Sequence, residues 1–559
     1  MQIQETQKLQ TEYAAEDKLF NFRPIFFFAI CLCLGIAFAL AWLRYGISPW
    51  WLTLALPVFI TAVCLQGKGK RLRAVLAVLV LSLAFLLGAA TTFSKIKNFE
   101  NTKVYEGTFI VSGQVVENVL DKDTCIVLLK NVKIGEKEVN GKLVAYLPYT
   151  FYENIRLSDS LKIKGELQTS VSAFDEYGFR ATAVYDDVRY TLSVASVEDC
   201  TITEPSFDIF LFVRQRIFDA LRTGMDETTA AVTMAVLTGD TSLMGESLLQ
   251  NMRYGGIAHV FAVSGLHVGA LYAFCLLLVG KTPLRKLPKA GRLALVAFVL
   301  LFYGGVCGYS ASVVRATVMC LAFYFGKLTG FSTDALENVG LSAVVVLLLS
   351  PVALFTVGFQ LSYVATLGII LLNKRIYSVI ERVGVKAFCY IKRQTPTEYA
   401  AERADRPLTL VESFARACAS FLSVTVSAQI ATTPLALYIF GYISVWSLLL
   451  NCTFVPILSA VFSVLLFITA IACLLPAAAS GVLLYVPSVV WSALLLVFQT
   501  LDFSKGLIDS VVLSGGTLVC YYGACLFLTD KWNASKGYKT FMFFAFALLF
   551  AVVFFLLNT

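Results

Sequence analysis

The sequence predicts a polytopic α-helical membrane protein with a small inserted β-barrel of the OB type, and three observations support this fold class. The mean hydropathy is +0.75 and only 15% of the 559 residues are charged, against about 25% in soluble proteins. Apolar stretches of about 20 residues, the length that crosses a bilayer, recur along the chain and suggest about 12–13 transmembrane helices. One polar segment with alternating strands interrupts them. A water-soluble or disordered chain is therefore excluded.

The first element is an N-terminal membrane unit. Residues 1–23 are acidic, and the orientation that the basic loops set places them in the cytoplasm. They are not a secretory signal, whose segment before the apolar stretch is positively charged. Residues 24–94 are expected to form three transmembrane helices. Their apolar stretches are Ile25–Leu43, Leu52–Gln66 and Ala74–Phe93.

Residues 95–204 follow the third span and are expected to form an extracellular OB-like domain. Five short β-type runs suit a small closed barrel: Thr108–Val116, Cys125–Val132, Lys142–Leu147, Leu161–Leu167 and Ala183–Tyr190. Residues 101–204 carry a net charge of −5, so a docking role is favoured over direct contact with a nucleic-acid strand. Cys125 and Cys200 could form a disulfide on the oxidising side of the membrane, which their separation neither supports nor excludes.

Residues 205–252 are predicted to hold amphipathic helices at the membrane interface, with apolar residues at helical spacing. Residues 253–559 then form a second transmembrane domain. Four basic loops, 67–73, 281–292, 373–418 and 530–539, sum to +15, more than the net +8 of the chain. If residues 443–475 cross the membrane once, counting spans places all four loops in the cytoplasm. The excess positive charge then reports topology and does not indicate polyanion binding.

The only two histidines of the chain, His259 and His267, lie within nine residues of each other. A continuous helix would bring both rings to one broad face, unless Ser264 and Gly265 interrupt it. Ionisable groups are costly inside a membrane and usually face a polar cavity, so a hydrated pathway is favoured over simple packing. Two histidines are too few for a zinc centre, and a Ser264–His267 pair lacks an acid and an oxyanion hole. We therefore expect no catalytic residue, metal or cofactor.

Other polar residues in apolar segments extend this pathway. Arg315 needs a carboxylate, a phosphate or water, and Asp240 or Glu246 could pair with it as readily as a phosphate. Single amides could hold helices together or line a polar route, and tyrosines could stack on bases. These residues are Gln360, Gln429, Asn451, Tyr254, Tyr309 and Tyr363.

The stretch AVLTGDTSLM…MRYGGIAHVFAVSGLHVGAL resembles the core motif of the ComEC family, the inner-membrane DNA-uptake channels of bacterial competence. Later blocks of that family also occur in order: GYSASVVRATVM, SPVALFTVGFQLSYVATLG and SAQIATTPLALYIFGYISVWSLLLN. The resemblance implies transport of single-stranded DNA across the cell membrane during natural transformation. Motif positions carried over from it are Asp240, Gly256, His259, Ser264, Gly265, His267, Arg315, Gln360 and Asn451.

Many family members end in a metallo-β-lactamase-like domain, whose metal cluster needs more than the two histidines of this sequence. We therefore expect that this chain is not itself that nuclease, and a separate nuclease is a possible partner. No GxxxxGK[ST] loop is present, so a cytoplasmic helicase or ATPase, or a gradient, is expected to drive transport. The resemblance also implies a DNA receptor, and lipid surrounds the spans. The same polar residues would serve a transporter or flippase for another anionic polymer or lipid, and a membrane scaffold that transports nothing is the third hypothesis.

Overall fold

The computed structural model describes residues 23–46, 68–392, 409–528 and parts of 542–549. Within these ranges it omits 122–123, 152–154, 158, 170–171, 176–177, 195–198, 204–206, 262, 332–333, 510 and 512. The predicted span Leu52–Gln66, residues 1–22 and the basic loop 530–539 lie outside the described residues, as does most of the predicted final span.

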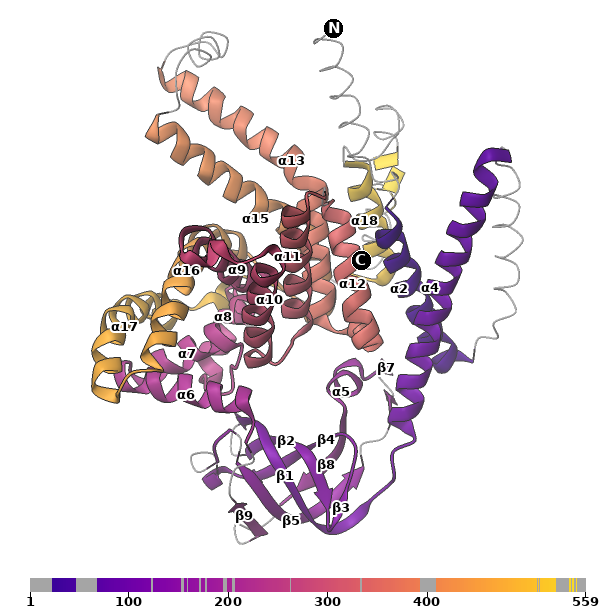
Figure 1. Ribbon diagram of the computed structural model, residues 1–559, viewed down its shortest axis with the longest axis vertical. Coiled ribbons are helices and arrows are strands. Elements are labelled where there is room, and N and C mark those ends of the chain that lie inside the picture. The colour runs from indigo at the N-terminus through magenta and orange to yellow at the C-terminus, as the bar shows by residue number, and fades with distance from the viewer. Residues whose placement is uncertain are drawn as a thin grey trace.

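The described part consists of a helical domain with a β-barrel beneath one end of it (Figure 1). We call that end the barrel-facing end. The α-helices are α2 (Pro24–Tyr45), α4 (Lys68–Glu100), α5 (Ala181–Asp186), α6 (Ile209–Gly224), α7 (Glu227–Thr238), α8 (Glu246–Tyr254), α9 (Gly265–Lys281), α10 (Lys289–Val306), α11 (Ala311–Thr329), α12 (Ala335–Leu349), α13 (Val357–Lys392), α15 (Leu410–Phe440), α16 (Trp446–Ala472), α17 (Ala477–Thr500) and α18 (Gly515–Leu528). Short 3-10 helices are η2 (Tyr149–Phe151), η4 (Ala258–Val260), η5 (Pro283–Lys286), η6 (Pro351–Phe355) and η7 (Phe503–Gly506).

Seven segments of the described chain are long and apolar enough to cross a membrane, and four shorter apolar helices accompany them. This confirms a polytopic helical membrane protein. The shorter ones include α12 and the first part of α16, whose Pro456 removes a helix hydrogen bond. Helices α13 and α15 extend together well beyond the rest of the bundle at the end away from the barrel (Figure 1).

The N-terminal helices pack through glycine. A Cβ on Gly35 of α2 would lie 2.0 Å from the carbonyl oxygen of Phe85 in α4, so only glycine lets the two backbones approach this closely. Arg23 joins this unit to the rest of the bundle through an ion pair with Asp334, with Nη2 and Oδ2 2.8 Å apart. Glu337 accepts from the Ile25 and Phe26 N–H groups and so caps the start of α2.

Five strands close into a barrel: β1 (Glu106–Asp121), β2 (Thr124–Ile134), β4 (Lys142–Pro148), β8 (Val188–Ser193) and β5 (Ser160–Thr169), in that order around the ring. The β1–β5 pairing closes it, and only the β4–β8 pair is parallel. Two further strands, β3 (Lys137–Glu138) and β9 (Cys200–Thr203), pair at the edges. This is the closed five-stranded arrangement expected of an OB-like domain.

The barrel interior follows from strand alternation, since every second side chain points inward. On β4, for example, Leu143, Ala145 and Leu147 are at most 1% exposed. Four of the five predicted runs match strands. The fifth, Ala183–Tyr190, is partly wrong because residues 181–186 form α5 and the strand begins only at Val188.

Cys125 and Cys200 are both buried free thiols and are not joined in a disulfide. Cys125 Sγ instead donates a hydrogen bond to Asn118 Oδ1, 3.0 Å away. Burial raises the pKa of each thiol to about 11, which disfavours the reactive thiolate.

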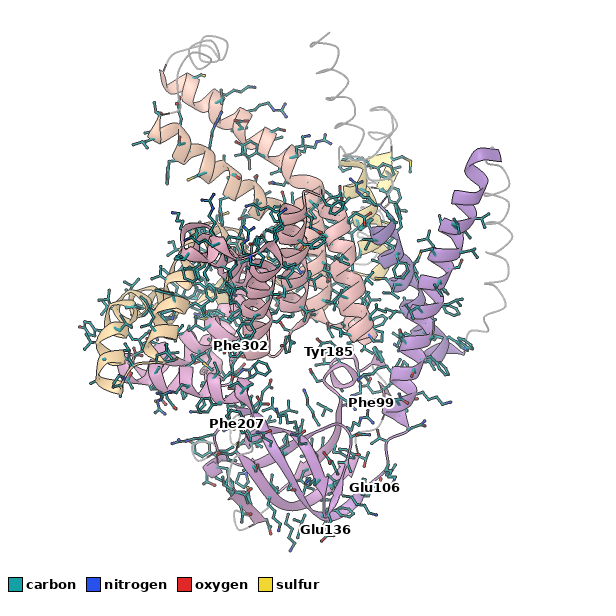
Figure 2. All side chains as sticks on the ribbon, in the orientation of Figure 1. Phe99, Glu106, Glu136, Tyr185, Phe207 and Phe302 are labelled. Atoms are coloured by element: carbon teal, nitrogen blue, oxygen red, sulfur yellow. The ribbon has the colours of Figure 1, made fainter. Side chains whose placement is uncertain are left out.

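The barrel touches the helical domain on two sides (Figure 2). On one side Lys130 of β2 forms an ion pair with Asp208, whose side chain also caps α6. On the other, Phe179 packs edge-to-face on Phe355 of η6, with ring centroids 5.5 Å apart. Between these contacts, β1, β2 and β4 form the barrel surface nearest the helices (Figure 1).

Candidate functional site

The first cluster of predicted site residues lies where α9, α11 and α13 meet. Arg315 of α11 is 8% exposed, and its Nη1 donates to the Ser362 carbonyl at 2.6 Å and to Thr366 Oγ1. Its Cζ lies 5.5 Å from the ring centroid of Tyr363. A Cβ on Gly265 would lie 3.1 Å from Arg315 Nη2, so the start of α9 faces the guanidinium. The structure therefore brings three predicted residues, Gly265, Arg315 and Tyr363, together.

The second cluster is centred on Ser447, which the sequence analysis missed. Its hydroxyl accepts from Gln429 Nε2 at 2.9 Å and from Asn451 Nδ2 at 3.5 Å. Gly256, with φ +73°, packs so closely that a Cβ there would lie 2.6 Å from Ser447 Cβ. Three predicted residues from α15, α16 and the turn after α8 thus converge on one serine. The Gln429 amide joins α15 to α16, whereas the Asn451 amide bonds within α16.

The two histidines lie close enough for their charges to interact, but on separate elements. Ser264 ends the preceding segment and caps α9, as the Ser-Gly pair suggested. His267 is 3% exposed, accepts the Ser264 N–H at Nδ1 and packs on Phe462, with ring centroids 4.2 Å apart. His267 is therefore a neutral helix-capping ring. His259 lies in η4 and is exposed.

Asp240 lies between the barrel and the bundle. It is 8% exposed; Oδ1 accepts from the Ser242 hydroxyl at 2.5 Å, while Oδ2 has no hydrogen-bond partner within the described ranges. It does not pair with Arg315. Instead it interacts electrostatically with Glu117 of β1, which also interacts with Arg214 of α6. Burial, followed by the charge of Asp240, raises the pKa of Glu117 above its usual value.

Charged residues of the barrel and of the bundle lie near one another where the two domains meet. Glu117 itself is exposed to water, so its pKa is raised by partial desolvation and not by full burial. Lys142 and Asp186 contribute further charges to the same region. Arg214 donates from Nε to the Val306 carbonyl at 2.5 Å and so satisfies the end of α10. Acidic and basic groups are thus both present where the two domains face each other.

The remaining predicted residues have structural contacts. Tyr309, at φ 51°, donates to the Leu301 carbonyl at 3.0 Å. Gln360 donates to the Leu354 carbonyl at 3.1 Å. Tyr363 is 7% exposed, with Phe359 stacked at 4.2 Å, so one face of its ring is closed to a nucleobase.

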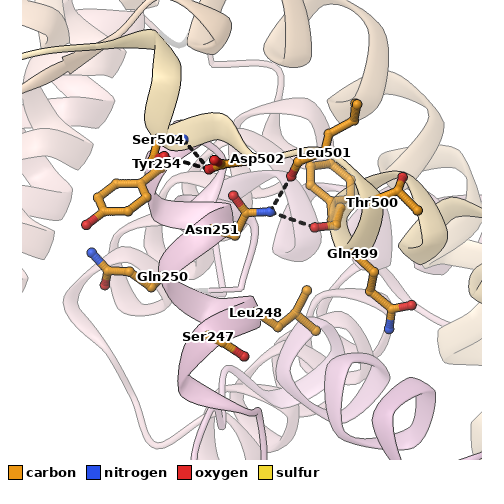
Figure 3. Close-up of a pocket in the computed structure, with 11 residues that line it drawn as sticks. Ser247, Leu248, Gln250, Asn251, Tyr254, Gln499, Thr500, Leu501, Asp502 and Ser504 are labelled. Atoms are coloured by element: carbon orange, nitrogen blue, oxygen red, sulfur yellow. Dashed lines mark hydrogen bonds between the residues drawn. The ribbon is translucent and has the colours of Figure 1, made fainter.

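A surface pocket of about 550 Å³ lies between α8, α17 and η7 (Figure 3). Tyr254 is the one predicted path residue that lines it, and its ring meets Tyr442 edge-to-face at 5.9 Å. Asn251 ties its walls together, donating to the Phe498 and Leu501 carbonyls at 2.6 and 2.7 Å. This pocket contains no residue of the Arg315 or Ser447 clusters.

The chemistry of these clusters is that of polar contacts. Among the described residues, no group of three or more His, Cys, Asp or Glu side chains could hold a metal ion. Arg315 offers a positive charge that no carboxylate of the described residues pairs with. Asp240 and Glu117 offer carboxylates, and the Ser447 cluster offers amides and a hydroxyl. Such groups can solvate a charged or hydrogen-bonding substrate in place of water.

The fold and these clusters define a polytopic helical membrane protein with an OB-like barrel docked at one end of its bundle and polar clusters within that bundle. A family model described as "Competence protein" matches residues 236–535, more than half of the chain. The chain therefore belongs to the competence protein family, and the resemblance to ComEC proteins is confirmed. It is 26% identical over 318 residues to ComE operon protein 3 of Bacillus subtilis (strain 168), a match that covers 56% of this chain. That match spans only 34% of the relative. No solved structure matches the chain.

Proposed function

We propose that this protein conducts single-stranded DNA across the cytoplasmic membrane during natural transformation, with the barrel outside the cell. Family membership supports a role in competence DNA uptake. The observation that carries the finer proposal is the placement of the barrel: its β1–β2–β4 surface faces the bundle (Figure 1), and Glu117 on it interacts with the motif residue Asp240. A strand that reaches this surface is delivered to the polar end of the bundle.

An acidic barrel can serve DNA if its aromatic side chains contact the bases and the bundle contacts the phosphates. Its net charge of −5 over residues 101–204 is unsuited to binding phosphates generally. Tyr146 and Tyr149 at the end of β4 are 41% and 51% exposed, so bases could stack on them. The barrel then mainly guides the strand to the entrance of the helical bundle, and the bundle supplies the phosphate contacts.

The basic residues at one end of the bundle indicate where a cytoplasmic partner would bind. Basic residues gather on α9, η5 and α10 at the end away from the barrel: Lys281, Arg285, Lys286, Lys289 and Arg292. This end is the cytoplasmic face by the positive-inside rule, and it is where a helicase or ATPase would pull on the strand. We propose that the chain itself is not an enzyme, that a DNA receptor delivers the duplex, and that a separate nuclease degrades the other strand.

Uptake of fluorescently labelled DNA tests the function. A deletion strain should lose uptake into the cytoplasm, and the restored wild-type gene should recover it. Normal uptake in the deletion strain would refute the function. Normal uptake in strains carrying Arg315→Ala or His267→Ala would refute only the assignment of these residues. Uptake of DNA but not of another labelled anionic polymer separates the DNA channel from a general polyanion transporter.

A further inference from the structure

One edge of the Arg315 guanidinium group makes no hydrogen bond to the described part of the protein. Nη1 is used by α13, through the Ser362 carbonyl and Thr366 Oγ1. Nε is buried without a hydrogen-bond partner in the described part of the chain, and no contact of Nη2 with a protein acceptor occurs there either. These two atoms form the forked edge that binds carboxylates and phosphates through two parallel hydrogen bonds. Arg315 is 8% exposed, and three of the five N–H donors of its guanidinium, one on Nε and two on Nη2, are unused by the described residues, so this edge needs an anion.

The open edge points at the N-terminus of α9. Arg315 Nη2 lies 3.1 Å from the point where a Cβ on Gly265 would be, and Gly265 is the first residue of this 17-residue helix. The Ser264 hydroxyl is already bonded to the Leu266 N–H. Among the described residues the Gly265 N–H has no acceptor. A helix N-terminus carries partial positive charge and free N–H groups, which favour a bound phosphate.

The charges around this edge suit a singly charged group. No carboxylate within the described ranges pairs with Arg315: Asp240 accepts from Ser242, and Glu246 pairs with Arg253 at 3.2 Å. His267 adds no charge, because its Nδ1 accepts a hydrogen bond from the Ser264 N–H. Ser264 and Gly265 are half-buried, so water reaches the start of the helix. One fixed positive charge matches the single negative charge of a phosphodiester.

We propose that the Nε–Nη2 edge of Arg315 and the N-terminus of α9 bind one phosphodiester of the DNA strand at a time. Ser362 and Thr366 position the guanidinium from behind, and glycine at 265 leaves room for the phosphate beside it. The inference rests on the proposed function and names the contact by which the bundle holds the strand. Inorganic phosphate shares the recognised chemistry and is the alternative occupant.

Binding of a fluorescent single-stranded oligothymidylate to the full-length protein in nanodiscs tests the site. Arg315→Gln removes the charge and should flatten the plot of log affinity against log salt by about 0.7, the loss of one phosphate contact. Gly265→Ala should weaken binding about tenfold by placing a methyl group in the phosphate position, while alanine suits the helix better than glycine. Gly269→Ala, one turn further along α9 with nothing within 4 Å of its Cβ, is the matched control and should bind normally.

Two probes, a methylphosphonate oligonucleotide and inorganic phosphate, distinguish binding of a DNA phosphodiester from binding of free phosphate at this site. An oligonucleotide with an uncharged methylphosphonate backbone should bind weakly and equally to wild type and both variants. Oligothymidylate binding that is unchanged in Gly265→Ala and Arg315→Gln overturns the inference, even if inorganic phosphate protects the wild-type protein from heat unfolding. Should Arg315→Gln fail to fold, Gly265→Ala alone decides. If DNA uptake persists and neither variant changes oligothymidylate binding, only the site is refuted. If the wild-type protein neither binds DNA nor supports uptake, the proposed function itself is refuted.

Discussion

Gly256→Ala should be strongly destabilising, because glycine is required there for two separate reasons. The residue has φ +73°, a left-handed conformation that L side chains rarely adopt. A Cβ would also lie 2.6 Å from Ser447 Cβ and 3.1 Å from Ser447 Cα, so the backbone of α16 would have to move. Both effects act at the hub that joins α15, α16 and the turn after α8.

The magnitude follows from the two contributions. The left-handed conformation costs about 1–2 kcal/mol in a residue with a Cβ. Forcing a methyl group into a filled space costs a further 1–3 kcal/mol or so. The free energy of unfolding should therefore fall by roughly 2–5 kcal/mol. Gly330→Ala provides the control, because Gly330 has φ +83° and nothing within 4 Å of its Cβ; it should lose only about 1–2 kcal/mol.

Denaturant unfolding of the purified variants in detergent measures both losses. The difference between Gly256→Ala and Gly330→Ala isolates the packing contribution. Adding Ser447→Gly to Gly256→Ala should recover that contribution, and a double-mutant cycle should give a coupling energy of about 1–3 kcal/mol. Equal losses in the two alanine variants, or no coupling to Ser447, would refute the reasoning.

Two further predictions concern the contacts that hold the domains together. Desolvation alone would raise the pKa of Asp208, but hydrogen bonds from Lys130 and the N–H groups at the start of α6 hold it below its usual range. The stabilisation of the folded protein by ionised Asp208 is therefore present above the ordinary pKa near 4 and is lost as pH falls through the lowered pKa. Asp208→Asn should lower the melting temperature at neutral pH and match wild type in strong acid. A difference in melting temperature that stays constant across pH would contradict this. Gly35→Ala should separate α2 from α4 and cost about 3 kcal/mol or more by forcing aside the Phe85 carbonyl, whereas Gly280→Ala, with nothing within 4 Å, should be neutral in the same unfolding assay.

The sequence predicted the classes of element well because their signals are local. Apolar runs indicated the long helices, and alternation indicated four barrel strands. Ser264 with Gly265 indicated an interruption between the two histidines, and α9 begins there. The error at Ala183–Tyr190 has a physical cause: the short helix α5 forms in the connection between two barrel strands, within the part of the barrel that packs on the bundle. Such a contact leaves no periodic signal.

The site was harder to predict because its partners come from distant spans. Asp240 and Glu246 were natural partners for Arg315 by chain position, yet the arginine is held by Ser362 and Thr366. Ser447 gave no signal of its own, since a lone serine after a tryptophan is unremarkable as a sequence. The positive φ of Gly256 is the one property that marks a tight approach there, and it appears only in three dimensions.

Site-specific crosslinking during DNA uptake tests the central claim most directly, namely that the strand passes between the barrel and the bundle. A photoreactive phenylalanine replaces Leu128, which lies opposite Glu117 in the β1–β2 ladder, or Glu136, at the end of the barrel away from the helices (Figure 2). The account predicts that incoming labelled DNA crosslinks to position 128 and not to position 136. Crosslinking at 136 alone, or at neither position while uptake continues, would contradict it.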